Sequence, residues 1–161
     1  MEILKFKNEK SAVINLDEIQ TNEIPHEIGE LTTIEKLIIQ PTKTNGNWSV
    51  YPALSWYENR EIKPPYRFIP VEIGQLKALK SLSLVNLDIK ELPETLIHLQ
   101  SLEFLNVSLN KLELENELPK FRVLKKLKHL MVLGNHYNEL EMQKFKAEFP
   151  SLNFEYKGEE Q

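Results

Sequence analysis

The feature that most constrains this chain is an apolar repeat with a fixed spacing. Leucine occupies 25 of the 161 positions, and many of these leucines follow one pattern. The clearest copy, at offsets 0, 3, 5, 8 and 10, consists of Leu102, Leu105, Val107, Asn110 and Leu112. The next copy has the same offsets and consists of Leu127, Leu130, Val132, Asn135 and Tyr137. A unit this short cannot bury its own apolar face, so the pattern predicts units that stack on one another.

Three earlier copies of the pattern are less complete. The first of them has Leu in the Asn slot and consists of Leu79, Leu82, Leu84, Leu87 and Ile89. The other two consist of Ile34, Leu37 and Ile39, and of Ser11, Ile14, Leu16 and Ile19. A second motif, with Ile or Leu before a Pro, occurs at residues 24–31, 69–76 and 92–99, and the next copy opens ten residues after that Ile or Leu.

With these two motifs in phase, the chain resembles the leucine-rich repeat family in its 23-residue form, LxxLxLxxNxL followed by LPxxIxxL. The resemblance covers roughly residues 11–140, as about five repeats. It implies an α/β solenoid with a curved parallel β-sheet on the concave side and short helical or 3-10 turns on the convex side.

The spacing also has a direct physical meaning. Offsets 3 and 5 alternate as in a strand, so Leu82 and Leu84 should point one way while the serines beside them point the other way. Asn110 and Asn135 are expected to turn inward and satisfy backbone groups at the bend, each of which would cost about 1–3 kcal/mol if left unpaired. Only two repeats carry this Asn, so local stability should vary along the solenoid.

One domain is expected over residues 1–161, with polar caps at both ends. Residues 1–10 are the expected N-terminal cap, and residues 138–161 the expected C-terminal capping helix and edge strand. Asn138 and Glu141 have capping-box spacing. The residues expected to share a face of that helix are Leu140, Phe145 and Phe149. The residues that alternate as in a closing strand are Leu152, Phe154 and Tyr156.

The regular spacing is interrupted near residues 41–68. Ile34 and Leu79 are 45 residues apart, whereas Leu79 and Leu102 are 23 apart. The extra stretch is rich in proline and contains six of the 14 aromatic residues. One interpretation is an inserted aromatic loop that folds over one face; the alternative is a disguised repeat built on Tyr51, Leu54, Trp56 and Asn59. Trp and Tyr are common at interface hot spots, but they fill cores equally well.

No catalytic or cofactor motif is present. The sequence has no GxSxG, no glycine-rich phosphate loop, no HExxH and no cysteine. His129 and His136 fall in one repeat without a third ligand, so no metal site is predicted. We therefore expect a protein that is not an enzyme and has no cofactor.

Charge is distributed unevenly, although the net charge is only −4. Residues 1–35 carry three Lys and eight acids, a sum of −5, and residues 118–146 carry seven basic and two acidic residues, a sum of +5. The dense basic run over residues 120–128 is expected to be a solvated convex face; a patch for an acidic partner or for nucleic acid is the alternative. The three glutamates just before it argue against nucleic acid. No apolar run approaches the roughly 18 residues of a membrane span, and no secretory segment is recognisable, so we expect a cytoplasmic protein that binds no membrane.

Stacked strands would place their outward residues in rows across the concave sheet. The expected first row is Val13, Lys36, Ser81, Phe104 and His129. The expected second row is Asn15, Ile38, Ser83, Asn106 and Met131. The expected third row is Asp17, Gln40, Val85, Ser108 and Leu133. Phe104, Met131 and Leu133 would then form an apolar cluster on a polar sheet, either as a binding spot or as the landing site of the aromatic insert.

The resemblance implies a non-enzymatic protein-interaction module, because leucine-rich repeat domains mostly recognise other proteins. The partner would be another protein and the chain a monomer, as an adaptor or an inhibitor of the immunity type. The alternative is a structural or regulatory subunit of a larger assembly. The predicted partner-binding residues are Phe104, Asn106, His129, Met131, Leu133, Ile38, Trp48, Trp56 and Tyr57.

Overall fold

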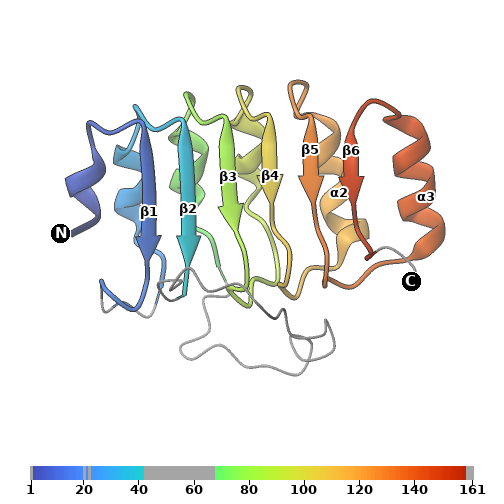
Figure 1. Cartoon of the computed structure of the whole chain (residues 1–161), viewed down its shortest axis with the longest axis horizontal. Coiled ribbons are helices and arrows are strands. Elements are labelled where there is room, and N and C mark those ends of the chain that lie inside the picture. Colours follow the sequence, from blue (N-terminus) through green and yellow to red (C-terminus); the bar gives the residue numbers. More distant parts are fainter. Residues whose placement is uncertain (1, 20, 22, 42–67, 159–161) are drawn as a thin grey trace.

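The computed structural model describes residues 2–19, 21, 23–41 and 68–158. Within these residues, six parallel strands pair in chain order to form one sheet. The strands are β1 (Ser11–Asn15), β2 (Lys36–Gln40), β3 (Ser81–Leu84), β4 (Phe104–Asn106), β5 (His129–Met131) and β6 (Asn153–Glu155). Figure 1 shows them side by side along the long axis of the molecule. The predicted leucine-rich repeat solenoid is therefore confirmed.

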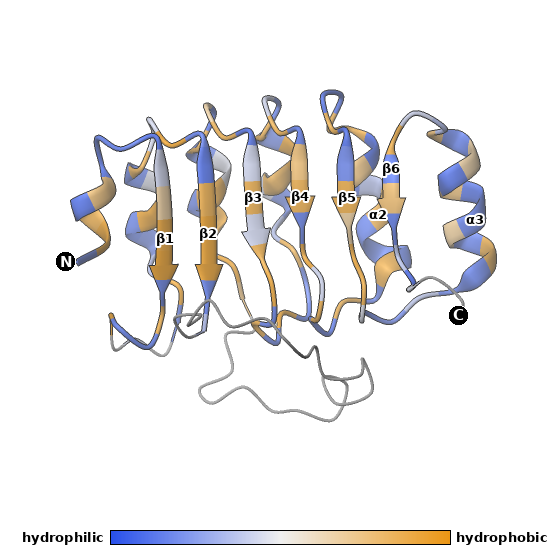
Figure 2. Ribbon diagram, viewed as in Figure 1, coloured by the Kyte–Doolittle hydropathy of each residue, from blue (hydrophilic) through white to orange (hydrophobic). Residues whose placement is uncertain are grey.

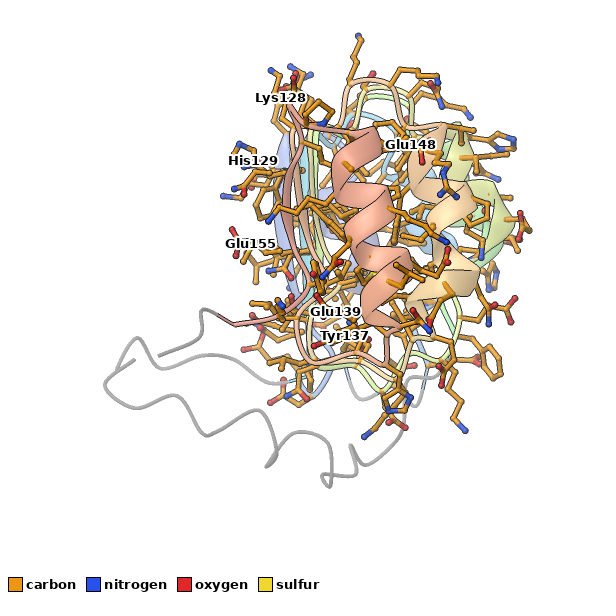
Figure 3. All side chains as sticks on the ribbon, turned by 90° about the vertical axis from the view of Figure 1, so that its right-hand side faces the viewer. Lys128, His129, Tyr137, Glu139, Glu148 and Glu155 are labelled. Atoms are coloured by element: carbon orange, nitrogen blue, oxygen red, sulfur yellow. The ribbon has the colours of Figure 1, made fainter. Side chains whose placement is uncertain are left out.

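Helical elements cover one side of this sheet and leave the other side open (Figure 3). They are the 3-10 helices η1 (Glu2–Phe6), η2 (His26–Glu30), η3 (Val71–Gln75) and η4 (Glu94–His98), and the α-helices α2 (Leu114–Arg122) and α3 (Glu139–Glu148). Pro25, Pro70 and Pro93 immediately precede η2, η3 and η4, with φ between −59° and −67°. The proline ring fixes φ in this range, which explains why the proline motif marks each 3-10 helix.

The core is a row of apolar side chains that runs from strand to strand. Colouring by hydropathy shows apolar residues in each of the strands, with β2 apolar over most of its length (Figure 2). Leu37, Leu82, Leu105 and Leu130 are in register on neighbouring strands, and all four are fully buried. This row continues the same contact from one repeat to the next, so each repeat depends on its neighbours for burial.

The two asparagines act between repeats, as predicted. The amide oxygen of Asn110 accepts hydrogen bonds from the backbone N–H groups of Leu87 and Ile89, at 3.0 and 3.2 Å, both in the preceding repeat. Its amide nitrogen donates to the carbonyls of Leu84 and Val107 at 2.8 Å. Asn135 repeats part of this pattern one unit later, where its oxygen accepts from the N–H of Leu112. These side chains replace backbone pairing at the bends.

The first strand pairs two residues away from the predicted register. Ser11, not Val13, is opposite Lys36, and Val13 is opposite Ile38. Ala12 and Ile14 consequently occupy the buried slots assigned above to Ile14 and Leu16. A shift of two residues keeps every side chain on the same face, so apolar alternation alone cannot detect it.

β2 and β3 pair directly, with Lys36 opposite Ser81 and Ile39 opposite Leu84. The described residues contain no strand between β2 and β3. The aromatic residues on which the two interpretations rest, including Trp48, Trp56 and Tyr57, lie outside the described residues.

The C-terminal helix begins where the capping box predicts. The side chain of Asn138 accepts a hydrogen bond from the N–H of Glu141 at 3.2 Å. The predicted buried face is wrong at one position: Leu140 is 59% exposed, whereas Met142 is fully buried with Phe145. Residues 142, 145 and 149 have the spacing of one helical face, and residue 140 falls beside it. The closing strand β6 then buries Phe154 and Tyr156.

The residues that immediately precede the first five strands alternate between positive and negative charge. This charge ladder consists of Lys10, Glu35, Lys80, Glu103 and Lys128. Glu35 forms ion pairs with Lys10 at 3.1 Å and with Lys80 at 2.7 Å, and Glu103 pairs with Lys128 at 2.9 Å. Hydrogen bonds from Lys80 and Lys10 hold the pKa of Glu35 below its usual value, and Lys128 does the same for the pKa of Glu103. The ion pairs of the ladder therefore stabilise the contact between neighbouring repeats in the observed order.

Replacing Asn110 with Ala should destabilise the chain by about 2–4 kcal/mol, because several buried backbone groups lose their partner. Asn116, which is exposed on α2, is the matched control, and Asn116→Ala should change stability by less than about 0.5 kcal/mol. Urea unfolding monitored by circular dichroism measures both. Equal effects of the two substitutions would show that Asn110 has no special role between repeats.

Replacing Glu35 and Glu103 together with Gln should lower Tm at neutral pH. A carboxyl group whose folded pKa is depressed stabilises the fold above its unfolded pKa, and this contribution is lost as pH falls through the folded pKa. The Tm difference between wild type and the double variant should thus shrink below about pH 4.5. Thermal melts across pH, with Glu9→Gln/Glu91→Gln as control, test this. A Tm difference that does not depend on pH would contradict the role of these carboxylates.

Candidate functional site

The candidate site is the open face of the sheet, defined as the outward residues of β1–β6 on the side without helices. Figure 3 shows His129 and Glu155 pointing away from the helical layer. The pairing defines two complete rows on this face. The first row is Ser11, Lys36, Ser81, Phe104, His129 and Asn153. The second row is Val13, Ile38, Ser83, Asn106, Met131 and Glu155.

Three predicted residues, here called the apolar cluster, are near one another in the sequence and register of β4 and β5. Phe104 lies in the first row, Met131 is diagonal to it in the second row, and Leu133 follows β5. All three side chains are half-buried, although none of the described helices covers this side. The ring of His129 lies beside that of Phe104, with centroids 6.2 Å apart. The arrangement places apolar and aromatic side chains next to one another.

Hydrogen bonds hold the backbone and the polar groups around this cluster. Ser108 accepts a hydrogen bond from the N–H of Leu133 at 3.1 Å, and the carbonyl of Leu133 accepts from the N–H of Leu109 at 2.7 Å. Leu109 has a φ of 60°, a left-handed conformation that is costly for a leucine. On the other side, the Asn153 amide is 3.2 Å from Nδ1 of His129. The cluster is thus built on a fixed backbone rather than on a free loop.

The remaining predicted residues divide into three groups. Asn106 lies between Ser83 and Met131 in the second row and accepts a hydrogen bond from the N–H of Ser108. Ile38 lies at the opposite end of the same row, away from the apolar cluster. Trp48, Trp56 and Tyr57 fall outside the described residues, so the structure does not place them against the open face.

Sequence reasoning missed the open-face residues of β6 and placed Val13 in the wrong row. Val13, 45% exposed, lies opposite Ile38, which creates a second apolar spot on β1 and β2. Asn153 and Glu155 extend both rows through β6. The alternation of Leu152, Phe154 and Tyr156 carried the signal for β6, because the residues between buried positions must point the other way. The alternation of β1 predicts that Val13 points outward, but it does not fix the register that places Val13 opposite Ile38.

The basic run over residues 120–128 is largely neutralised in the structure. Lys120 is buried, contrary to the prediction of a solvated face, and pairs with Glu117 at 3.0 Å. Burial raises the pKa of Glu117 despite this lysine. Arg122 pairs with Glu148 at 3.1 Å, and Lys128 belongs to the charge ladder. The helix geometry explains the difference, since residues 117 and 120 are one turn apart on the inner side of α2.

The described residues were also considered for a metal site and for a membrane-spanning helix. No group of three or more His, Asp or Glu side chains is arranged there to hold a metal ion. None of the described helices is long and apolar enough to cross a membrane. His136 forms an ion pair with Glu113 at 2.8 Å, and both side chains are exposed.

The sequence matches no protein-family model, and no curated protein matches it significantly. Solved structures do resemble it. A leucine-rich repeat protein from Leptospira interrogans is 22% identical, with a TM-score of 0.57 over 83% of this chain and 28% of that chain. An internalin from Listeria monocytogenes is 14% identical, with a TM-score of 0.58 over 85% of this chain and 34% of that chain. The chain thus spans about a third or less of each of these proteins, and the likeness identifies its fold as that of leucine-rich repeat proteins.

Shortening the apolar cluster should cost little stability. Phe104→Ala and Met131→Ala should each destabilise by less than about 1.5 kcal/mol, because these side chains are only half-buried. Leu105→Ala, on the buried side of the same strand, should cost about 2–5 kcal/mol. Urea unfolding compares the three variants. A loss at Phe104 or Met131 as large as at Leu105 would mean that the cluster belongs to the core.

Proposed function

We propose that this chain is a protein-interaction module that binds another protein through the open face of β4, β5 and β6. The observation that carries the proposal is the apolar cluster of Phe104, Met131 and Leu133 on a sheet face that no helix covers. A solvent-facing strand gains nothing from such side chains, whereas a partner that covers them gains their burial.

The surroundings of the cluster are those of a specific interface. His129, Asn153 and Glu155 supply hydrogen-bonding groups beside it, as in the polar rim around an interface hot spot. The fixed backbone of the strands means that little ordering entropy is lost on binding. Leucine-rich repeat proteins commonly recognise other proteins, and this analogy of fold supports the same reading.

The finer parts of the proposal concern the setting of the protein. We propose that it acts without catalysis, as a cytoplasmic monomer, and serves as an adaptor or as an inhibitor of the immunity type. Ile38, together with Val13, would add a second contact at the far end of the open face. In the alternative, a structural subunit, the same cluster would be covered permanently in an assembly, and the isolated chain would not be a monodisperse monomer.

Replacing Phe104 and Met131 together with Asp should abolish capture of the partner. The experiment is a pull-down from lysate of the source organism, with bound proteins identified by mass spectrometry and folding of each variant checked by circular dichroism. Two introduced carboxylates at the centre of an apolar contact should weaken binding by at least about 100-fold, because they would be buried without partners.

The matched control is Val123→Asp/Leu140→Asp, which introduces the same charges at apolar residues that are 40% and 59% exposed on the helical side. This control should capture the same protein as wild type. Equal capture by the open-face variant and by wild type would overturn the assignment of the binding face. Light scattering of the purified chain separates the module from the permanent subunit.

A further inference from the structure

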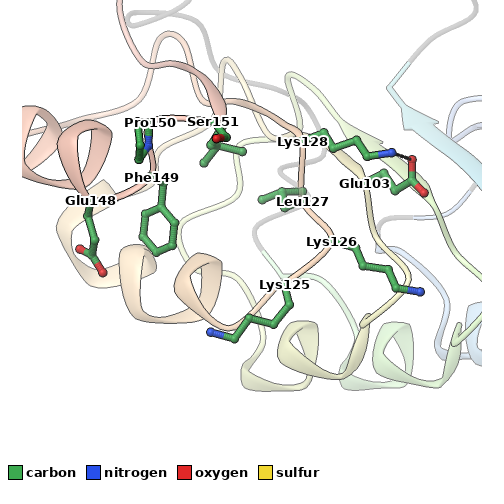
Figure 4. A pocket seen from close by; sticks show the side chains of 10 residues that line it. Glu103, Lys125, Lys126, Leu127, Lys128, Glu148, Phe149, Pro150 and Ser151 are labelled. Carbon is green, nitrogen blue, oxygen red and sulfur yellow. Dashed lines mark hydrogen bonds and ion pairs between the residues drawn. The ribbon is translucent and has the colours of Figure 1, made fainter.

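A pocket of about 600 Å³ opens at the edge of the sheet where β5 and β6 begin. We call it the rim pocket. Its apolar lining consists of Leu127, Phe149, Pro150 and Leu152. Figure 4 shows the side chains of Leu127 and Phe149 in the middle of the pocket, with Lys125 and Lys126 along one side. Three of these apolar residues pack partly against the core, so the pocket floor is fixed by the fold.

The charges around the rim pocket are not balanced. Both acidic residues of its lining already have partners, since Glu103 pairs with Lys128 and Glu148 pairs with Arg122. Among the described residues, the ammonium group of Lys125 donates a hydrogen bond to the backbone carbonyl of Arg122, at 3.5 Å. Lys126 is exposed and has no carboxylate within ion-pair distance among the described residues. The charged residues of the lining therefore carry a net positive charge beside an apolar floor, although Lys126 also helps to lower the pKa of Glu103.

The rim pocket is continuous with the open face. Glu103 and Lys128 line the pocket, and the next residues along the chain, Phe104 and His129, belong to the first row. In the same way, Leu152 lines the pocket and the next residue, Asn153, belongs to that row. A protein seated on the apolar cluster can thus extend a segment over the edge of the sheet and into the pocket.

We propose that the rim pocket binds an acidic segment of the protein partner, held by an apolar side chain on Leu127 and Phe149 and by carboxylates on Lys125 and Lys126. This inference rests on the proposed function, because it adds a second contact to the same partner. Charge complementarity commits it to an acidic peptide, and the apolar floor distinguishes that peptide from a simple polyanion. Two exposed lysines give orientation and rate of association more than affinity, so the apolar contact must contribute to binding.

The test uses the full chain and a fluorescein-labelled peptide of sequence EDLFDE, with binding followed by fluorescence anisotropy. Wild type should show saturable binding that weakens as salt is added, since exposed charges are screened. Lys125→Glu/Lys126→Glu should weaken binding by at least about tenfold. The control Lys77→Glu/Lys90→Glu changes the net charge equally at exposed lysines outside the pocket and should bind as wild type does. Lys125→Ala/Lys126→Ala should also lose affinity without introducing repulsion, which guards against a folding defect in the reversed variant.

Two further probes make the outcome decisive. The peptide EDSSDE should bind at least about tenfold more weakly than EDLFDE, because it has no apolar side chain to bury. A short single-stranded RNA should not displace EDLFDE. Absence of saturable binding by wild type, equal binding by the lysine variants, equal binding of EDSSDE, or displacement by RNA would each overturn the proposal. Phe104→Asp/Met131→Asp should still bind the peptide, so failure of the open face as partner site is separable from failure of the rim pocket.

Discussion

Each repeat of this chain leaves backbone groups and an apolar edge unsatisfied, and only a neighbouring repeat in the correct register satisfies both. Asn110 illustrates the coupling: it belongs to the fourth strand-turn unit but caps the N–H groups of Leu87 and Ile89 in the third. The buried row from Leu37 to Leu130 makes the same demand through packing. The hydrogen bonds and the buried contacts both require the same strand register. A sequence whose individual repeats match the consensus poorly can therefore still specify a single sheet.

That register also determines which residues a partner can meet. With every buried leucine on the helical side, the alternate positions must form a continuous open face. Most of them are small or polar, and Ser81 and Ser83 separate two apolar spots on it. Phe104, Met131 and Leu133 depart from this rule, and Val13 beside Ile38 departs from it at the other end. The ion pairs of the charge ladder lie along one edge of the same face, and Lys125 and Lys126 line the rim pocket at that edge.

The parts of the structure that follow from periodic apolar burial were predictable, and the parts that depend on contacts between distant residues were not. The leucine spacing predicts the sheet, the proline motif predicts η2, η3 and η4, and Asn138 predicts the start of α3. The register of β1 escapes prediction because a slip of two residues preserves its buried face. The burial of Lys120 depends on the pairing with Glu117 on an α-helix where a shorter turn was expected. The aromatic residues Trp48, Trp56 and Tyr57 belong to the part of the chain that the structure does not describe.

If, as proposed, a protein partner covers the open face at β4 and β5, site-specific photo-crosslinking should capture it there. A photoreactive amino acid at Asn106 lies between the residues of the apolar cluster, and the same amino acid at Val71 lies on the exposed helical side. Binding at the open face should give a discrete cross-linked adduct of constant mass from position 106 in cells of the source organism, and none from position 71. Adducts from position 71 alone, or equal adducts from both positions, would contradict it.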